Sequence, residues 1–257
     1  MMKLIASDLD GTLLLNGAQR VDDSMFNTIR ELTKKGYVFA AASGRHIVSL
    51  YRLFEPVCED IAYISENGGL VKYKGITISK TIMDKDLVMD IIKDVYQIPN
   101  CELLVSGENS AYIKPKTEEY LYRMTKIVNY KTTVLKDFSD IPEEIVKVSV
   151  CDLSGIKHSK DYLIKQWGDK CAATVSGALY LDFMAKGVSK GTGIERLQTY
   201  FNISPKDCAA FGDNYNDIPM LDKVYDSYVM EQADDKVKEH GKYRCSHVEE
   251  TIKSKFL

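Results

Sequence analysis

The sequence predicts an α/β fold in which a parallel sheet forms the core and a smaller α+β cap domain is inserted into it. Apolar runs alternate with amphipathic segments near both ends of the chain, and this alternation is lost in the middle. Three of the apolar runs also end in polar turns that contain glycine. We therefore expect a discontinuous core domain, residues 1–83 and 185–257, and a cap domain, residues 84–184.

The N-terminal part of the chain alternates strand and helix. Apolar residues recur on one helical face after Asp22, and Gly36 follows where a C-terminal cap belongs. The run 37–42 is apolar throughout, which is typical of a strand covered on both faces. The expected elements are a strand at 3–7, a helix from Asp22, a strand at 37–43, a helix at 46–54 and a strand at 60–65.

The middle of the chain has a different pattern. Glycines between β-branched runs predict a hairpin over 68–79, and helically spaced apolar residues predict a helix over 84–97. Short strand-like runs and helical segments then mix, which indicates an α+β region with its own small core. The expected strands are 102–106, 111–114, 146–152 and 178–183, and the expected helices lie near 117–128 and 158–167.

From about residue 186 the alternation returns. The segment 187–201 is rich in glycine and then helical, and apolar runs at 208–213 and 225–230 predict two further buried strands before a helical tail. These segments complete the parallel sheet that the N-terminal part begins.

Composition narrows the class of protein. The net charge of −3 over 257 residues gives no general attraction to nucleic acid or to a membrane surface. The six cysteines are widely spaced and favour free thiols in a reducing compartment. No apolar run is long enough for a signal peptide or a membrane span. We expect a cytoplasmic protein with a small-molecule partner; its oligomeric state is open, and a monomer is compatible with the sequence.

Polar segments follow three of the predicted strands. They are "SDLDGT" (7–12), "ASGR" (42–45) and "GDNYND" (212–217). Each segment alone is more often a turn than a site. Ligands of open parallel sheets bind outside the carboxyl ends of the strands, so the three together predict a site at that edge.

Acidic residues dominate two of these segments. A divalent cation would make the like charges of Asp8 and Asp10 tolerable, and Asp213 can add a carboxylate from a neighbouring strand end. Mg²⁺ suits such a site because it prefers hard oxygen ligands and keeps waters and substrate oxygens around it. A calcium-binding EF-hand is excluded, because Gln19 and Val224 stand where its glutamate would be needed.

Several residues have two interpretations. Ser43 and Gly44 can form a phosphate cradle, or Ser43 can cap the next helix. Arg45 can reach a substrate or brace the cap, and Asp217 can hold a metal-bound water or cap a helix. Lys190, in "GVSKGTG", is favoured over Lys186 as a phosphate-binding lysine. Further substrate-side candidates are Asn67 and, in the cap, Tyr112, Lys114, Lys116 and Arg123, for which solvated surface positions are the simpler interpretation.

The motifs "DLDGT" (8–12), "SGR" (43–45), Lys190 and "GDNYND" (212–217) resemble, in this order, the four motifs of the haloacid-dehalogenase-like hydrolases. The position and size of the insertion resemble the Cof-type branch with a C2-type cap on a Rossmann-like core. The resemblance implies a Mg²⁺-dependent phosphatase of small phosphorylated metabolites such as sugar phosphates, with a mobile cap. A phosphosugar mutase and a non-catalytic binder of phosphometabolites are the alternatives.

The resemblance also implies roles for single residues. Asp8 is the nucleophile that forms an aspartyl-phosphate. Asp10 is the general acid and base, and it reaches the metal through its main-chain carbonyl. Lys190 binds phosphate and restrains Asp8. The expected phosphate- or substrate-binding residues are Leu9, Thr12, Ser43, Gly44, Arg45, Lys190 and Asn216, and the expected metal ligands are Asp8, Asp10, Asp213 and Asp217.

Overall fold

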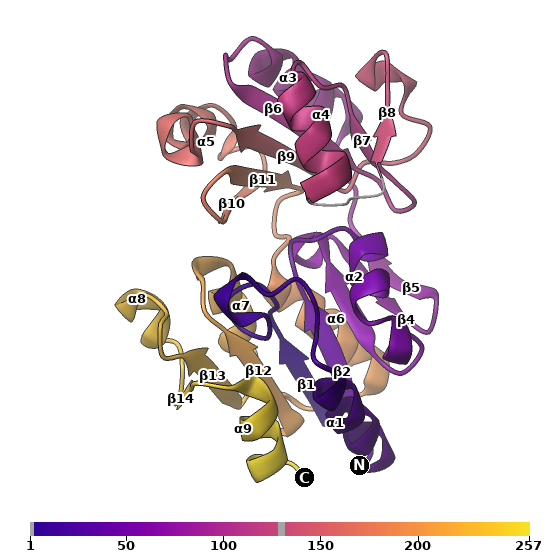
Figure 1. Cartoon of the computed structure of the whole chain (residues 1–257), viewed down its shortest axis with the longest axis vertical. Helices are drawn as coiled ribbons and strands as arrows, with labels where there is room; N and C mark the ends of the chain where they lie inside the picture. The colour runs from indigo at the N-terminus through magenta and orange to yellow at the C-terminus, as the bar shows by residue number, and fades with distance from the viewer. Residues whose placement is uncertain (1–2, 128–131) are drawn as a thin grey trace. The chain divides into compact units, whose positions relative to one another are not determined.

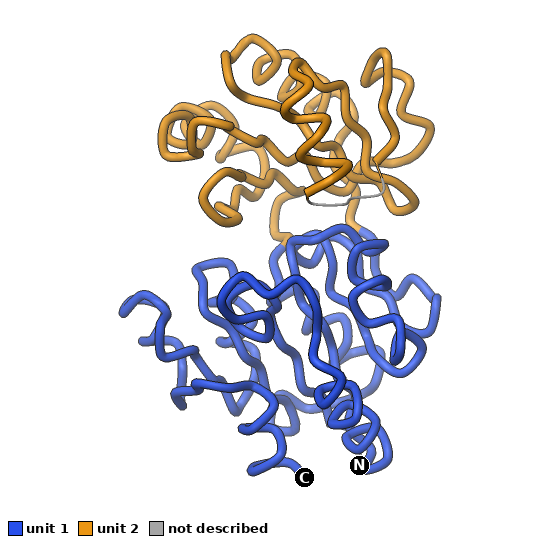
Figure 2. Tube along the Cα trace, viewed as in Figure 1, with its two compact units in different colours: residues 1–80, 189–257 blue, residues 81–188 orange. Residues whose placement is uncertain are grey.

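The computed structural model describes residues 3–127 and 132–257. The chain divides into two compact units (Figure 2). Unit 1 comprises Met1–Lys80 and Ser189–Leu257, and unit 2 comprises Thr81–Val188. The sequence placed the corresponding boundaries after residues 83 and 184.

A sheet of eight strands, counted over the described residues, forms the framework of unit 1 (Figure 1). Its order is β14-β13-β12-β1-β2-β3-β4-β5, parallel from β14 to β3 and antiparallel for β4 and β5. The predicted α/β class is confirmed, although the short strand β14 was not predicted. The strands are β1 (Lys3–Ser7), β2 (Tyr37–Ala42), β3 (Ala62–Ser65), β4 (Leu70–Tyr73), β5 (Ile76–Lys80), β12 (Cys208–Gly212), β13 (Asp226–Met230) and β14 (Tyr243–Cys245).

Helices cover both faces of this sheet. Leu4 and Ala6 of β1 pack in one apolar cluster with Ile194 and Leu197 of helix α6. Ile5 points to the other face, because side chains alternate along a strand. The helices of unit 1 are α1 (Asp23–Lys34), α2 (Ile47–Leu53), α6 (Lys190–Phe201), α7 (Ile218–Leu221), α8 (Asp235–Lys238) and α9 (Val248–Lys255).

Helix α1 shows how local sequence sets these elements. It starts after the extended residue Asp22 and buries one apolar face that includes Ile29 and Leu32. It ends just before Gly36, whose φ of 84° is a left-handed conformation that glycine adopts without steric cost. Both predicted ends of this helix are confirmed.

Unit 2 contains a second sheet, of six strands in its described residues. Its order is β10-β11-β9-β6-β7-β8, and all neighbours are antiparallel except β7 and β8. The strands are β6 (Cys101–Ser106), β7 (Ala111–Ile113), β8 (Thr132–Val134), β9 (Lys147–Asp152), β10 (Ala172–Ser176) and β11 (Tyr180–Met184). The strands β8 and β10 were not predicted.

The helices of unit 2 divide between the two faces of its sheet. Helices α3 (Lys85–Tyr96) and α5 (Lys160–Trp167) pack on one face, with Val148 and Val150 of β9 beneath them. Helix α4 (Glu118–Tyr122), followed by a π-helical turn over Arg123–Ile127, packs on the other face beside Leu104 and Ile113. The predicted end of this helical segment, residue 128, lies outside the described residues.

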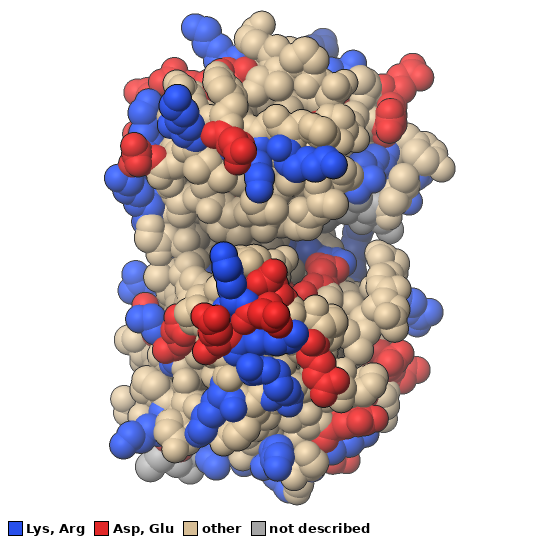
Figure 3. All heavy atoms as spheres, turned by 90° about the vertical axis from the view of Figure 1, so that its left-hand side faces the viewer, with Lys and Arg blue, Asp and Glu red and all other residues tan. Residues whose placement is uncertain are grey.

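The surface carries charges of both signs. Acidic and basic side chains are interspersed on the face of the molecule that Figure 3 shows, and over the whole sequence they nearly balance to a net charge of −3. None of the helices in the described part of the chain has the length and apolar character that a membrane span requires.

Candidate active site

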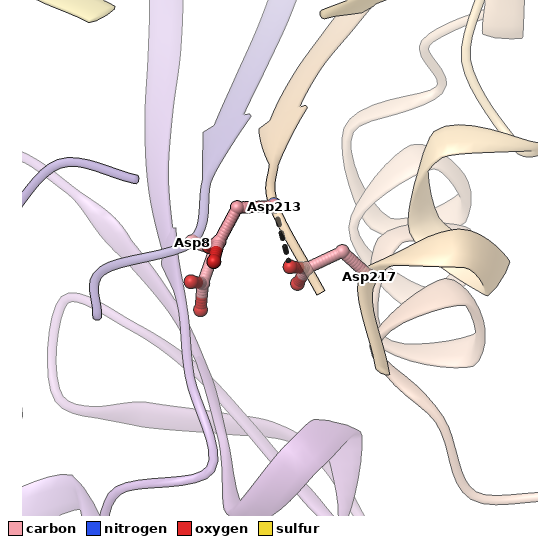
Figure 4. Close-up of side chains that lie close together, drawn as sticks. All are labelled: Asp8, Asp213 and Asp217. Carbon is pink, nitrogen blue, oxygen red and sulfur yellow. Dashed lines mark hydrogen bonds between the residues drawn. The ribbon is translucent and has the colours of Figure 1, made fainter. Parts of the chain in front are cut away.

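Three carboxylates of unit 1 point toward one another (Figure 4). Asp8 directly follows β1, and Asp213 directly follows β12. These strands are parallel neighbours, with Ser7 opposite Phe211, so their carboxyl ends place both residues side by side. Asp217 lies one turn further along the chain. One oxygen from each of the three carboxylates lies within 4.8 Å of the others.

Lys190 is buried against this group. Its side chain is 1% exposed, and its Nζ donates to Asp8 Oδ1 at 2.5 Å and to Asp217 Oδ1 at 2.6 Å. Lys190 begins α6, directly after the N-cap Ser189, whose hydroxyl accepts from the N–H of Thr192. This cap fixes the start of the helix and therefore the direction in which Lys190 extends.

The charges of the cluster are not balanced. Burial raises the pKa of Asp8 well above its usual value, Asp217 raises it further, and Lys190 counteracts this only in part. Burial also raises the pKa of Asp213. For Lys190, burial lowers the pKa, but Asp217 and Asp8 outweigh this effect and raise it. Three carboxylates face one ammonium group, so the site favours an additional cation.

The side chain of Asp217 contacts both the site and the backbone of the loop before it. Its Oδ2 accepts from the backbone N–H groups of Asp213 and Asn214, at 3.0 Å each, and its Oδ1 accepts from Lys190. Asp217 precedes α7 but makes no side-chain bond to it. Asp217 is the N-cap residue of α7, and its carboxylate caps the short 3-10 helix Tyr215–Asp217 that precedes α7, where it forms a capping box with Asn214.

The side chain of Asp10 lies apart from the three clustered carboxylates. It is 57% exposed, and Arg45 donates to it from Nη2 at 2.5 Å and from Nε at 2.9 Å. In an extended strand the residues Asp8 and Asp10, two apart, would face the same side. This expectation does not hold here, because β1 ends at Ser7 and the chain then turns, with the carbonyl of the buried Leu9 accepting backbone bonds from Thr12 and Leu14.

The loop after Asp10 supports Asp213. Thr12 Oγ1 donates to Asp213 Oδ1 at 2.6 Å. Gly11 has a φ of +94°, and a Cβ there would lie 2.4 Å from Asp213 Oδ2, so this close approach requires glycine. Gln232 donates to the Gly11 carbonyl at 2.7 Å. Sequence reasoning missed Gln232, which lies outside every motif.

Ser43 does not cap the helix that follows it. The N-cap of α2 is His46, whose Nδ1 accepts from Val48 N, so the capping interpretation of Ser43 is wrong. The Ser43 hydroxyl instead accepts from the backbone N–H of Arg45 at 3.2 Å. Arg45, which we expected at the substrate or the cap, donates to Asp10, a pairing that the sequence did not reveal.

Asn67 connects two of the predicted segments. Its backbone N–H donates to the Ser43 carbonyl at 3.0 Å, and its Oδ1 accepts from Asn216 Nδ2 at 3.1 Å. A Cβ on Gly44 would lie 3.1 Å from Asn67 Nδ2. The structure therefore brings Ser43, Gly44, Asn67 and Asn216 together in unit 1.

The cap candidates have partners inside unit 2. The side chains pair as Tyr112 with Glu143, Lys114 with Asp137, Lys116 with the Ile98 carbonyl, and Arg123 with Tyr180. These contacts account for the four side chains without a substrate.

The acidic cluster fits a magnesium ion. Mg²⁺ takes carboxylate oxygens as ligands and retains several waters, and Asp8, Asp213 and Asp217 offer such oxygens from a partly buried position. The raised pKa values of Asp8 and Asp213 indicate that ionisation of the cluster lacks sufficient compensating charge. A bound cation would supply this charge.

A family model described as haloacid dehalogenase-like hydrolase matches residues 5–252. The chain belongs to the haloacid dehalogenase-like hydrolases. The family resemblance seen in its motifs is thereby confirmed, and the protein is an enzyme of this hydrolase family. Its four motifs, as expected, lie in unit 1.

Relatives of this hydrolase are named phosphatases. The 5-amino-6-(5-phospho-D-ribitylamino)uracil phosphatase YbjI of Escherichia coli K12 is 27% identical over 246 residues, which are 95% of this chain and 90% of that protein. A solved protein from Eubacterium rectale has 27% identity and a TM-score of 0.88, covering 100% of this chain and 99% of its own. The subclass IIB sugar phosphatase BT4131 has the same fold, with 20% identity, a TM-score of 0.82 and 98% coverage of both chains.

Proposed function

We propose that this hydrolase is a Mg²⁺-dependent phosphatase that acts on small phosphorylated metabolites through an aspartyl-phosphate on Asp8. The observation that carries the proposal is the buried Asp8, held by Lys190 within 4.8 Å of two further carboxylates. The names of its relatives support a phosphatase. The free state of all six cysteines fits a cytoplasmic enzyme.

In this mechanism Asp8 attacks the phosphorus atom. Lys190 holds Oδ1 of Asp8 in place, and a carboxylate oxygen of Asp8 would form the new P–O bond. The bond from phosphorus to the substrate alcohol breaks, and Asp10 gives that alcohol a proton. Asp10 then takes a proton from the water that hydrolyses the aspartyl-phosphate, which restores both carboxyl groups.

The remaining residues position these groups. Thr12 orients Asp213, and Lys190 joins Asp8 to Asp217. Asp8, Asp213 and Asp217, with the main-chain carbonyl of Asp10, would hold Mg²⁺. When bound, the ion would supply positive charge to the phosphoryl oxygens. Ser43, Gly44, Asn216 and the backbone N–H of Leu9 would contact the phosphate.

A screen of phosphorylated metabolites with Mg²⁺ tests the proposal. We expect phosphate release from one or more sugar phosphates or related compounds, and from a generic aryl phosphate, and we expect excess chelator to stop it. Phosphorus NMR separates release from transfer back to a sugar, which a mutase would show. Binding without any release across the whole screen would instead support a non-catalytic protein and contradict the proposal.

Magnesium is expected to stabilise this protein, and more strongly as pH rises. The folded-state pKa values of Asp8 and Asp213 are raised, so their protonated forms stabilise the metal-free fold at low pH, and this contribution is lost as pH rises through those values. Mg²⁺ binds the ionised carboxylates. At a hundred times Kd we expect about 2.7 kcal/mol of stabilisation at neutral pH. Thermal unfolding with Mg²⁺ and with chelator, at pH 5 and pH 8, measures this stabilisation. An equal rise in melting temperature at both pH values would contradict a magnesium site made of these carboxylates.

A further inference from the structure

A glutamine outside the four motifs contacts the loop that carries Asp10 and Thr12. Gln232 lies in the turn 231–234, between β13 and α8, and its Nε2 donates to the Gly11 carbonyl at 2.7 Å. Gln232 is exposed, and an exposed side chain loses rotamer freedom when a single hydrogen bond holds it. The net contribution of this bond to stability is therefore small, and its main effect is on the position of the Gly11 backbone.

The peptide unit between Gly11 and Thr12 is held at both of its polar groups. Its carbonyl accepts from Gln232, and its N–H, which is that of Thr12, donates to the Leu9 carbonyl at 3.2 Å. Because a peptide unit is planar, two hydrogen bonds on opposite sides fix its orientation. The orientation of this unit in turn sets the direction in which the Thr12 side chain extends.

Both residues of this peptide unit contact Asp213, an expected metal ligand. The Thr12 hydroxyl donates to Asp213 Oδ1 at 2.6 Å. Gly11 approaches the other oxygen so closely that a Cβ there would lie 2.4 Å from Oδ2. Gly11 and Thr12 therefore flank the Asp213 carboxylate, and Gln232 holds the peptide unit that joins them.

The turn that presents Gln232 is itself anchored. The N–H of Glu231 donates to the Cys245 carbonyl of β14 at 3.0 Å. Ala233 is buried in the apolar cluster that β1 shares with α6. Because the residues on both sides of Gln232 are fixed, its side chain links a rigid part of unit 1 to the loop that follows β1.

The same turn also contacts the loop that carries Asp213. Its last residue, Asp234, caps α8, and the Asp234 carboxylate also forms a hydrogen bond with Tyr215. Tyr215 lies between Asp213 and Asp217 in the chain. The turn 231–234 is therefore connected to both loops from which the clustered carboxylates come.

We propose that Gln232 is a positioning residue of the magnesium site, which holds the Asp213 carboxylate in place for Mg²⁺ through the peptide unit of Gly11 and Thr12. This inference rests on the proposed function, because it takes Asp213 as a ligand of Mg²⁺. Groups that orient a metal ligand change the affinity for the metal although they do not touch it. Gln232 acts in this way on Asp213.

Gln232→Met tests the inference through the binding of Mg²⁺ alone, measured by isothermal titration calorimetry. Methionine has a similar length but no donor, so the bond to the Gly11 carbonyl is lost. We expect the Kd for Mg²⁺ to rise about three- to tenfold, because Thr12 and Asp213 are then held less firmly. We expect the melting temperature of the metal-free variant to change by no more than about 2 °C, because Gln232 is exposed. A lower melting temperature with an unchanged Kd is the result of a merely structural role and overturns the inference.

A double-mutant cycle with Thr12→Val tests the route of the effect. Valine keeps the shape of threonine and removes the hydroxyl that donates to Asp213. Since Gln232 acts through Thr12, we expect Gln232→Met to raise the Kd for Mg²⁺ less in the Thr12→Val background than in wild type. An equal rise in both backgrounds contradicts this route and overturns the inference.

Gln19→Met is the matched control. Gln19 is also exposed, and it also donates from Nε2 to a glycine carbonyl, that of Gly17 at 2.9 Å. We expect its substitution to leave the Kd for Mg²⁺ unchanged, because this bond joins residues of a single loop two positions apart. The same rise in Kd for Gln19→Met and Gln232→Met overturns the inference.

The inference and the proposed function can fail separately. Wild-type protein that binds Mg²⁺ but releases no phosphate in the screen contradicts the proposed function, and the Kd of Gln232→Met still decides the inference. Phosphate release by wild-type protein, with the same Kd for Mg²⁺ in wild type and Gln232→Met, overturns the inference alone. Wild-type protein that binds no Mg²⁺ contradicts both.

Discussion

Asp8→Asn is expected to reduce phosphate release by a factor on the order of 10⁴ or more while the protein stays folded. An amide oxygen is a far weaker nucleophile than a carboxylate, so the aspartyl-phosphate cannot form. The amide has nearly the same shape, and its oxygen can still accept from Lys190. Turnover of a substrate found in the screen, together with thermal unfolding in chelator, measures both effects.

The stability of Asp8→Asn shows the effect of the Asp8 charge alone, because the substitution removes the charge and keeps the shape of the side chain. Burial and Asp217 both raise the pKa of Asp8, so removing this charge relieves an unfavourable ionisation. We therefore expect the metal-free variant to be as stable as wild type at pH 8, or more stable. Asp86→Asn, an exposed position in the first turn of α3, is the control and is expected to change neither quantity appreciably. Phosphate release by Asp8→Asn at the wild-type rate would disprove the role of Asp8.

Lys190→Met is expected to destabilise the fold strongly and to abolish turnover. Methionine fills similar volume but leaves Asp8 and Asp217 without their shared cation. Removing one partner of a buried ion pair costs about 3–5 kcal/mol. The pKa of Lys190 is raised above the ordinary value for lysine. The stability that its protonated ammonium group gives the fold is therefore fully present below that ordinary value, and it is lost only as pH rises through the raised pKa. The loss of unfolding free energy in Lys190→Met should therefore be similar at pH 6 and pH 9.

Lys186→Met is the matched control. This lysine is exposed and was the competing candidate from sequence, and surface substitutions usually change stability by less than about 0.5 kcal/mol. Chemical denaturation of both variants gives the comparison. Magnesium is expected to restore part of the stability of Lys190→Met, because a cation can balance the remaining carboxylates. Equal effects of the two substitutions would contradict the assignment of Lys190.

Much of the fold was predictable because its signals are local. The uniformly apolar runs at β1 and β2 identify strands covered on both faces, and Asp22 and Gly36 mark the two ends of α1. The strands β8, β10 and β14 were missed. Each is short or contains exposed positions, so its residues carry little of the apolar pattern that identifies a buried strand.

The sequence by itself identified most residues of the candidate site, because three of the four motifs directly follow a predicted strand and the fourth supplies Lys190. Only the tertiary structure decided how they pair. Thr12 donates to Asp213, which lies 201 residues further along the chain. Arg45 donates to the carboxylate of Asp10, a contact that the strand pattern did not predict. Periodicity describes side-chain direction only while a strand or helix continues. Beyond Ser7 the chain turns, and the direction of each carboxylate depends on cations and N–H groups from distant segments.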